Sequence, residues 1–214
     1  MGKIYYTGIG ARLTPGPLID SHEASPLSIL RRWGYTLALL GFTLRSGAAD
    51  GADHAFENGC NLAGNLIGSE FEPCRKEIYL PWAGFNGSQS ALHYIPSEAF
   101  EIAADIYGVG WKHLKLAVKK LMARNILQVM GIGLDEPSTF VLCWTRDGCN
   151  TADARTKETG GTGQAIAYAD EMNIPIFNFG KYTFDKRNGK DDWLDYFDLH
   201  IAHWLKEISL EKIK

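Results

Sequence analysis

The chain has 214 residues, of which 45% are hydrophobic and 12% aromatic, so it is long and apolar enough to fold as one α/β domain. Its 22 basic and 25 acidic residues give a formal net charge of −3, whereas proteins that grip duplex DNA usually carry a basic surplus. Composition therefore argues against extensive nucleic-acid binding, although it is compatible with a local basic patch.

The cysteines and the N-terminus indicate the compartment. Cys60, Cys74, Cys143 and Cys149 form no CxxC pair and lack zinc-ligand spacing, so we expect unpaired intracellular thiols. The opening MGKIYYTGIGARL has no signal-peptide pattern, and no apolar run approaches the roughly 18 residues of a membrane span. We predict a soluble cytoplasmic protein with no metal, no cofactor and no membrane partner.

Short apolar runs bounded by glycine alternate with longer segments of helical period, a pattern typical of parallel strands joined by helices. The expected strands cover residues 3–7, 42–45, 77–81, 139–144 and 174–177. The expected helices cover residues 25–40, 52–63, 96–107, 111–130 and 161–173. An amphipathic C-terminal helix, over about 185–214, is expected to pack on the same domain. The predicted fold is a single α/β domain over 1–214, a Rossmann-like parallel sheet flanked by helices.

Polar, glycine-rich segments follow these strands at the edge where open parallel sheets bind ligands. They cover residues 8–12, 46–51, 82–90 and 159–163. Glycine lets backbone amides approach a ligand, and helix N-termini offer unpaired N–H donors, so together these turns predict a phosphate site. One glycine turn alone is more often only a geometric link. Leu13 stands where the dinucleotide fingerprint needs its third glycine, so we do not expect a nicotinamide dehydrogenase.

Charged residues near the turns allow two interpretations each. Arg12 could hold a phosphate or form a surface salt bridge, and Asp50 could accept from ribose hydroxyls or cap a helix. Asp53 lies in the first turn of a predicted helix, where a carboxylate is favoured by the helix dipole alone. Arg124 and Asn125 lie late on a long helix, where an arginine is usually solvated.

Further candidates follow other strands. Trp82, Phe85 and Trp144 could stack on a base, although packing is the commoner role of such residues. Arg45 and Arg146 could add phosphate contacts, because arginine suits bidentate phosphate recognition.

Segments 8–15 (GIGARLTP), 45–53 (RSGAADGAD), 123–125 (ARN) and 160–165 (GGTGQA) occur in the order seen in the SLOG superfamily. Over roughly residues 3–180 the chain resembles that superfamily, which includes the DNA-processing protein DprA/Smf, the LOG phosphoribohydrolases and many small phage and bacterial proteins. The resemblance implies a DprA-like sheet that binds nucleotides or nucleotide-derived molecules, with the Arg-Asn pair near the ligand groove. It also implies a homodimer or homotetramer.

The turns and the resemblance together give one set of candidates. The predicted ligand-binding residues are Gly8, Gly10, Ala11, Arg12, Ser46, Gly47, Ala48, Asp50, Asp53, Trp82, Arg124, Asn125, Trp144, Thr145, Gly160, Gly161, Thr162 and Gly163.

Three functions remain open at this point. The first is binding of a small nucleotide-derived signal, of ADP-ribose or cyclic-nucleotide type, by a sensor or sequestering protein, including a phage protein that counters host defence. The second is a nucleotide N-glycosidase like the LOG enzymes, but Thr159, Gln164 and Ala167 replace the proline, threonine and glutamate of their last loop, so we assign no catalytic residue. The third is a DprA-like accessory factor for single-stranded DNA, which the net charge disfavours.

Overall fold

The computed structural model describes residues 3–16, 25–67 and 75–181. All of them belong to one compact unit, Met1–Lys181. The C-terminal helix predicted over about 185–214, and its packing on the domain, lie outside the described residues.

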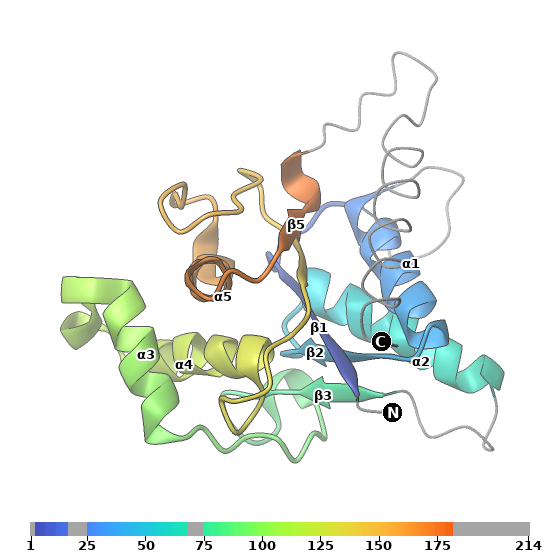
Figure 1. Cartoon of the computed structure of the whole chain (residues 1–214), viewed down its shortest axis with the longest axis horizontal. Helices are drawn as coiled ribbons and strands as arrows, with labels where there is room; N and C mark the ends of the chain where they lie inside the picture. The colour runs from blue at the N-terminus through green and yellow to red at the C-terminus, as the bar shows by residue number, and fades with distance from the viewer. Residues whose placement is uncertain (1–2, 17–24, 68–74, 182–214) are drawn as a thin grey trace. The chain divides into compact units, whose positions relative to one another are not determined.

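A five-stranded parallel sheet lies at the centre of this unit (Figure 1). The strands are β1 (Ile4–Gly10), β2 (Phe42–Ser46), β3 (Lys76–Ile78), β4 (Val141–Trp144) and β5 (Ile176–Asn178), in the order β3-β2-β1-β4-β5. The order reverses between β1 and β4, which makes their carboxyl ends the topological switch point where open α/β sheets bind ligands. The predicted α/β, Rossmann-like fold is confirmed.

Helices cover both faces of the sheet (Figure 1). On one face lie α1 (Pro26–Leu39) and α2 (Ala52–Ile67); on the other lie α3 (Ser97–Tyr107), α4 (Leu116–Met130) and α5 (Gly163–Glu171). Side chains of β1 alternate between the two layers, as strand geometry requires. Tyr6 meets the Phe56 ring of α2 at a centroid distance of 6.3 Å, whereas the Thr7 hydroxyl donates to the Gln128 carbonyl of α4 at 2.6 Å. The central strand therefore anchors the last turns of α4.

β1 is longer than the sequence predicts. Instead of ending before a glycine loop, the strand continues through Gly8 to Gly10. A Cβ at Gly8 would lie 2.7 Å from the Phe56 ring, and a Cβ at Gly10 would lie 2.6 Å from the Ala52 Cβ. Both glycines are needed because α2 packs directly on the strand at these positions.

Two other boundaries also differ from the prediction. The helix predicted from residue 111 begins at Leu116, after a 3-10 segment, Gly108–His113. The strand predicted over 174–177 corresponds to β5, which begins two residues later. Ile174 still belongs to the turn that ends α5, because its N–H donates to the Ala169 carbonyl at 2.8 Å.

The cysteine prediction is wrong in one respect. Cys60 is disulfide-bonded, whereas we expect unpaired thiols at all four positions from the sequence. Cys143 and Cys149 are free and buried. Within residues 3–16, 25–67 and 75–181, no helix has the length and apolar character that crossing a membrane requires.

Candidate functional site

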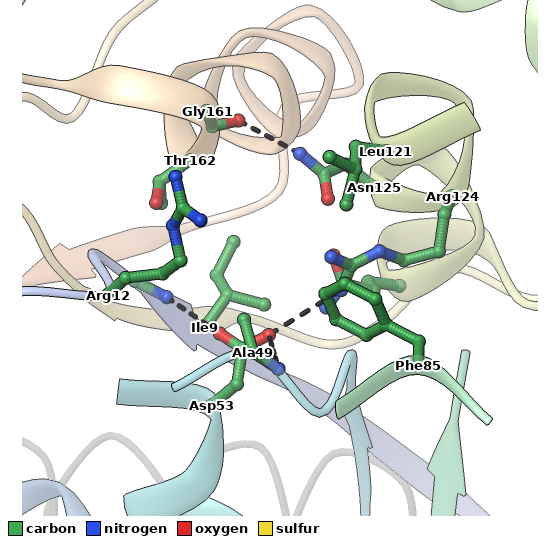
Figure 2. Close-up of a pocket in the computed structure, with 12 residues that line it drawn as sticks. Ile9, Arg12, Ala49, Asp53, Phe85, Leu121, Arg124, Asn125, Gly161 and Thr162 are labelled. Carbon is green, nitrogen blue, oxygen red and sulfur yellow. Dashed lines mark hydrogen bonds and ion pairs between the residues drawn. The ribbon is translucent and has the colours of Figure 1, made fainter. Parts of the chain in front are cut away.

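A cavity of about 140 Å³ lies at the carboxyl ends of β1 and β2, between α4 and the turn before α5 (Figure 2). The predicted ligand-binding residues that line it are Gly10, Arg12, Asp53, Arg124, Asn125, Gly161 and Thr162. They come from separate parts of the sequence, and the sheet topology brings them to the switch point beside β1.

A buried ion pair joins the two sides of this cavity. Asp53 and Arg124 are only 3% and 4% exposed, and Arg124 Nη1 lies 3.5 Å from Asp53 Oδ2. The Asp53 carboxylate also accepts from the Gly10 N–H at 3.2 Å and from the Ala49 N–H at 3.4 Å (Figure 2). Burial raises the pKa of Asp53 to about 6, although Arg124 and both amides act in the opposite direction.

The carboxylate of Asp53 thus occupies the position that the sequence assigns to a ligand phosphate. The Gly10 and Ala49 amides are among the donors that we expect to clasp an anion, and both already bond to Asp53. The deep end of the cavity is therefore an anion cradle filled by the protein's own side chain.

Gln128 extends the polar network along α4. One orientation of its amide satisfies every neighbour: the oxygen accepts from Arg124 Nη1 at 3.0 Å and from the Gly47 N–H at 2.9 Å, and the nitrogen donates to Asn125 Oδ1 at 2.9 Å. Asn125 Nδ2 in turn donates to the Gly161 carbonyl at 2.9 Å (Figure 2). The network therefore connects the turn after β2 to the turn before α5.

One donor of the buried arginine is not used. Within the described residues, Arg124 Nε is buried and has no hydrogen-bond partner. The Phe85 ring lies over the guanidinium, 6.0 Å from Cζ. Burial also lowers the pKa of Arg124, partly offset by Asp53, yet an arginine remains protonated. An unsatisfied N–H on a buried cation is costly, so this unpaired Nε needs a physical explanation.

The mouth of the cavity is more open. Arg12 is exposed and extends toward Thr162 (Figure 2). A Cβ at Gly160 would meet nothing within 4 Å, and one at Gly161 would meet only Met122 Cε at 3.8 Å. The turn before α5 therefore leaves space on its backbone, as the sequence predicts.

The glycines after β2 have a different role from the predicted one. A Cβ at Gly47 would lie 1.2 Å from Arg124 Nη1, and a Cβ at Gly51 would lie 2.5 Å from the Ala11 and Arg12 carbonyl oxygens. Gly51 also has a φ of 76°, which favours glycine. These glycines admit Arg124 and a neighbouring loop, not a ligand.

Several predicted ligand-binding residues do not line the cavity. They are Gly8, Ala11, Ser46, Gly47, Ala48, Asp50, Trp82, Trp144, Thr145, Gly160 and Gly163. Some have structural bonds instead: the Ser46 hydroxyl donates to the Gly8 carbonyl at 2.6 Å, and the Thr145 N–H donates to Asn178 Oδ1 at 3.0 Å. Trp144 is 7% exposed, so packing accounts for it.

Arg45 and Arg146 lie away from the cavity as well. Arg45 is 1% exposed, stacks on the Tyr5 ring with Cζ 3.6 Å from its centroid, and donates from Nε to Glu77 at 2.8 Å. Arg146 is exposed, with Nε 3.5 Å from Glu158. Arg45 therefore does not line the cavity, contrary to the expectation of a phosphate contact, and forms a structural ion pair with Glu77 instead.

A second carboxylate organises the loop that leads to α5. Asp147 accepts from the hydroxyls of Thr145, Thr156 and Thr159 and from the Cys149 N–H. Burial alone would raise the pKa of Asp147, but these hydrogen bonds outweigh it and lower the pKa to about 2. Because Thr159 immediately precedes the Gly160–Thr162 segment, Asp147 holds the mouth of the cavity in position.

Sequence reasoning left some cavity residues off the predicted ligand-binding set: Ile9, Ala49, Phe85, Leu121 and Gln128. Gln128 had a usable signal, because it stands four residues after Arg124 and therefore on the same helix face. Phe85 and Ala49 also had a signal, as a possible stacking ring and as part of the segment 46–51, whereas Ile9 and Leu121 resemble ordinary core residues.

Within the part of the chain that the structure describes, no group of three or more His, Cys, Asp or Glu side chains could hold a metal ion. No family model, no curated protein and no solved structure matches this chain, so the resemblance to the SLOG superfamily stays a prediction.

Proposed function

We propose that this protein binds a small nucleotide-derived molecule in the cavity beside β1, as a sensor or a sequestering protein. The observation that carries the proposal is the buried Arg124 guanidinium, which forms part of the cavity wall with one N–H unpaired. Buried charges are expensive to desolvate, so an incompletely paired one that lines a cavity is a candidate for a role in binding.

The size of the cavity limits what can enter. At about 140 Å³ it is smaller than the roughly 300–1,000 Å³ of clefts that enclose a whole drug-sized ligand. A ribose with one phosphate fits that space better than a whole dinucleotide. A base would then lie outside, near the rings of Phe85 and Trp82, which meet edge to face at 5.1 Å.

The mouth supplies groups suited to a phosphate. Arg12 is exposed at the rim, and its guanidinium can bind phosphate with two parallel hydrogen bonds. Gly161 and Thr162 immediately precede α5, so their amides lie at the positive end of that helix.

A pair of arginine variants tests the proposal. Titration calorimetry with AMP and ADP-ribose measures binding to the wild type, to Arg12→Ala at the rim, and to Arg146→Ala, a matched exposed arginine outside the cavity. We expect Arg12→Ala to weaken binding about tenfold, the value of a charged hydrogen bond, and Arg146→Ala to leave it unchanged. Absence of binding to the wild type, together with no small molecule released from the denatured protein, would reject the proposal.

A second candidate is a hydrolase that cleaves the N-glycosidic bond of a nucleotide. The observation that favours it is Asp53, a buried carboxyl at the cavity whose pKa is raised to about 6, within the range of a general acid or base. Chromatography of AMP and ADP-ribose after incubation distinguishes the two: a free base or a free ribose phosphate, formed by the wild type and not by Asp53→Asn, would support the hydrolase.

A further inference from the structure

Asp53 has spare capacity to accept hydrogen bonds. A carboxylate offers about four lone-pair sites, whereas Asp53 has three donors in the described residues, Gly10 N, Ala49 N and Arg124 Nη1. Their distances of 3.2, 3.4 and 3.5 Å are long for bonds to a charged acceptor, which are normally nearer 2.7–2.9 Å. A ligand hydroxyl that donates to Asp53 would therefore add a shorter bond than any present.

Arg124 has spare capacity to donate. Nη1 is shared between Asp53 at 3.5 Å and the Gln128 oxygen at 3.0 Å, while Nε has no partner. The Phe85 ring that faces the guanidinium is only partly buried. The Asp53 carboxylate and the Arg124 guanidinium, which both belong to residues that line the cavity, thus lie beside each other (Figure 2).

This combination selects among chemical groups. A phosphate has only acceptors at neutral pH, so at the deep end it would satisfy Arg124 but meet the Asp53 carboxylate as a like charge. An amine would satisfy Asp53 but not Arg124. Two adjacent hydroxyls satisfy both, one by donating to Asp53 and the other by accepting from Arg124.

We infer that the deep end of the cavity recognises the 2′,3′-diol of a ribose, with one hydroxyl donating to Asp53 and its neighbour accepting from Arg124. The inference rests on the proposed function and specifies its ligand. It places the diol inward and the phosphate outward, toward Arg12 and the turn at Gly161 and Thr162. Among the two signal types that the sequence suggests, it selects the ADP-ribose type, because a 3′,5′-cyclic nucleotide has no free vicinal diol.

A panel of matched nucleotides tests the inference by titration calorimetry. The probes are AMP, 2′-deoxy-AMP, 3′,5′-cyclic AMP and ADP-ribose. We expect AMP and ADP-ribose to bind at least about tenfold more tightly than the two compounds without the diol, since a site with buried polar groups rejects an analogue that leaves them unpaired. Binding of 2′-deoxy-AMP or cyclic AMP as tight as that of AMP overturns the diol inference and leaves the proposed function standing. Failure of all four to bind, together with no small molecule released from the denatured protein, rejects both the diol inference and the proposed function.

Two variants test whether Asp53 causes the preference for nucleotides with a diol. In Asp53→Asn, which keeps the side-chain shape, the preference for AMP over 2′-deoxy-AMP should fall to about threefold or less. Asp50→Asn is the matched control, because Asp50 is exposed, lies three residues away and does not line the cavity, so the preference should not change. An Asp53→Asn protein that keeps the full preference overturns the assignment to Asp53; if that variant does not fold, the wild-type panel still decides.

Discussion

The two glycine turns at the sheet edge look alike in sequence and differ in what lies opposite them. After β2, the space over Gly47 is filled by Arg124, whose Nη1 would lie 1.2 Å from an added Cβ. Before α5, the space over Gly160 and Gly161 is open, with no atom closer than 3.8 Å. The protein's own side chains fill the space over one turn and leave the space over the other open.

The difference arises from α4. Its last two turns are buried from Ala123 to Met130, and they bring Arg124 and Gln128 against the turn after β2. Toward the turn before α5, α4 extends Asn125, which donates to the Gly161 carbonyl, and Met122, whose Cε would lie 3.8 Å from a Cβ at Gly161. A glycine turn alone therefore does not indicate a ligand site. Whether the turn is accessible depends on the side chains that pack opposite it.

The largest expected effect comes from removing Arg124, which fills the space over the turn after β2. Arg124→Leu leaves Asp53 as a buried, unpaired carboxyl, so we expect the free energy of unfolding to fall by about 3–5 kcal/mol in a chemical denaturation experiment at pH 7. The double variant Asp53→Asn plus Arg124→Leu removes both charges and should be more stable than Arg124→Leu alone. Equal stability of the single and double variants would show that an unpaired Asp53 is not what destabilises Arg124→Leu.

A matched pair of glycine variants tests the comparison directly. Gly47→Ala forces Arg124 out of its position and should lower the free energy of unfolding by about 2–3 kcal/mol, a typical cost of overpacking. Gly161→Ala adds the same methyl group in open space and should change stability by less than about 1 kcal/mol. Thermal and denaturant unfolding of both proteins measure the difference, and similar losses would mean that the two turns are equally constrained.

The sheet and its helices are predictable because their signals are local. Apolar runs and helical spacing are properties of short segments, and they place β2 and α2 within a few residues of the observed bounds. The predicted bounds of an element are wrong where contacts with a distant part of the sequence determine where the element ends. β1 continues through Gly8 and Gly10 because α2 packs on it there, which no pattern within 3–10 can reveal.

The site is predictable only in part, for a related reason. All strands of a parallel sheet end at the same edge, so Gly10, Arg12 and Gly161, which lie in segments that follow strands, can be assigned to that edge from the sequence. The pairing of Asp53 with Arg124 depends on which face of α4 meets the sheet, a tertiary relation that helical spacing alone leaves open. Spacing favours solvent for an arginine late on a helix, whereas Arg124 is 4% exposed.

The buried Asp53 carboxyl, which pairs with Arg124, predicts a dependence of stability on pH. The pKa of Asp53 is about 6 in the folded protein against a usual value of 3.8, so between about pH 4 and 6 the folded state binds more protons than the unfolded state. Stability should therefore fall as the pH rises through this window, by about 3 kcal/mol in total. Asp53→Asn, measured by denaturation from pH 4 to 7, should lack this decline; the same decline in both proteins would assign it to another group.

The smallest expected effect concerns Asp147, in the loop that leads to the turn before α5. Its pH dependence has the opposite sign to that of Asp53, because stability falls as the pH falls. Asp147 has a pKa of about 2 because the hydroxyls of Thr145, Thr156 and Thr159 outweigh the effect of burial, so its bonds stabilise the fold above about pH 4 and are lost as the pH falls toward 2. Since Asp147 is exposed, solvent screens the effect, and Asp147→Asn should cost only about 1 kcal/mol at pH 7 and almost nothing near pH 2. Asp153→Asn removes an exposed carboxylate from the same loop and should leave stability unchanged. Because Thr159 precedes the open turn, Asp147→Asn should also weaken AMP binding in titration calorimetry; a loss of stability with unchanged affinity would separate this loop from the mouth of the cavity.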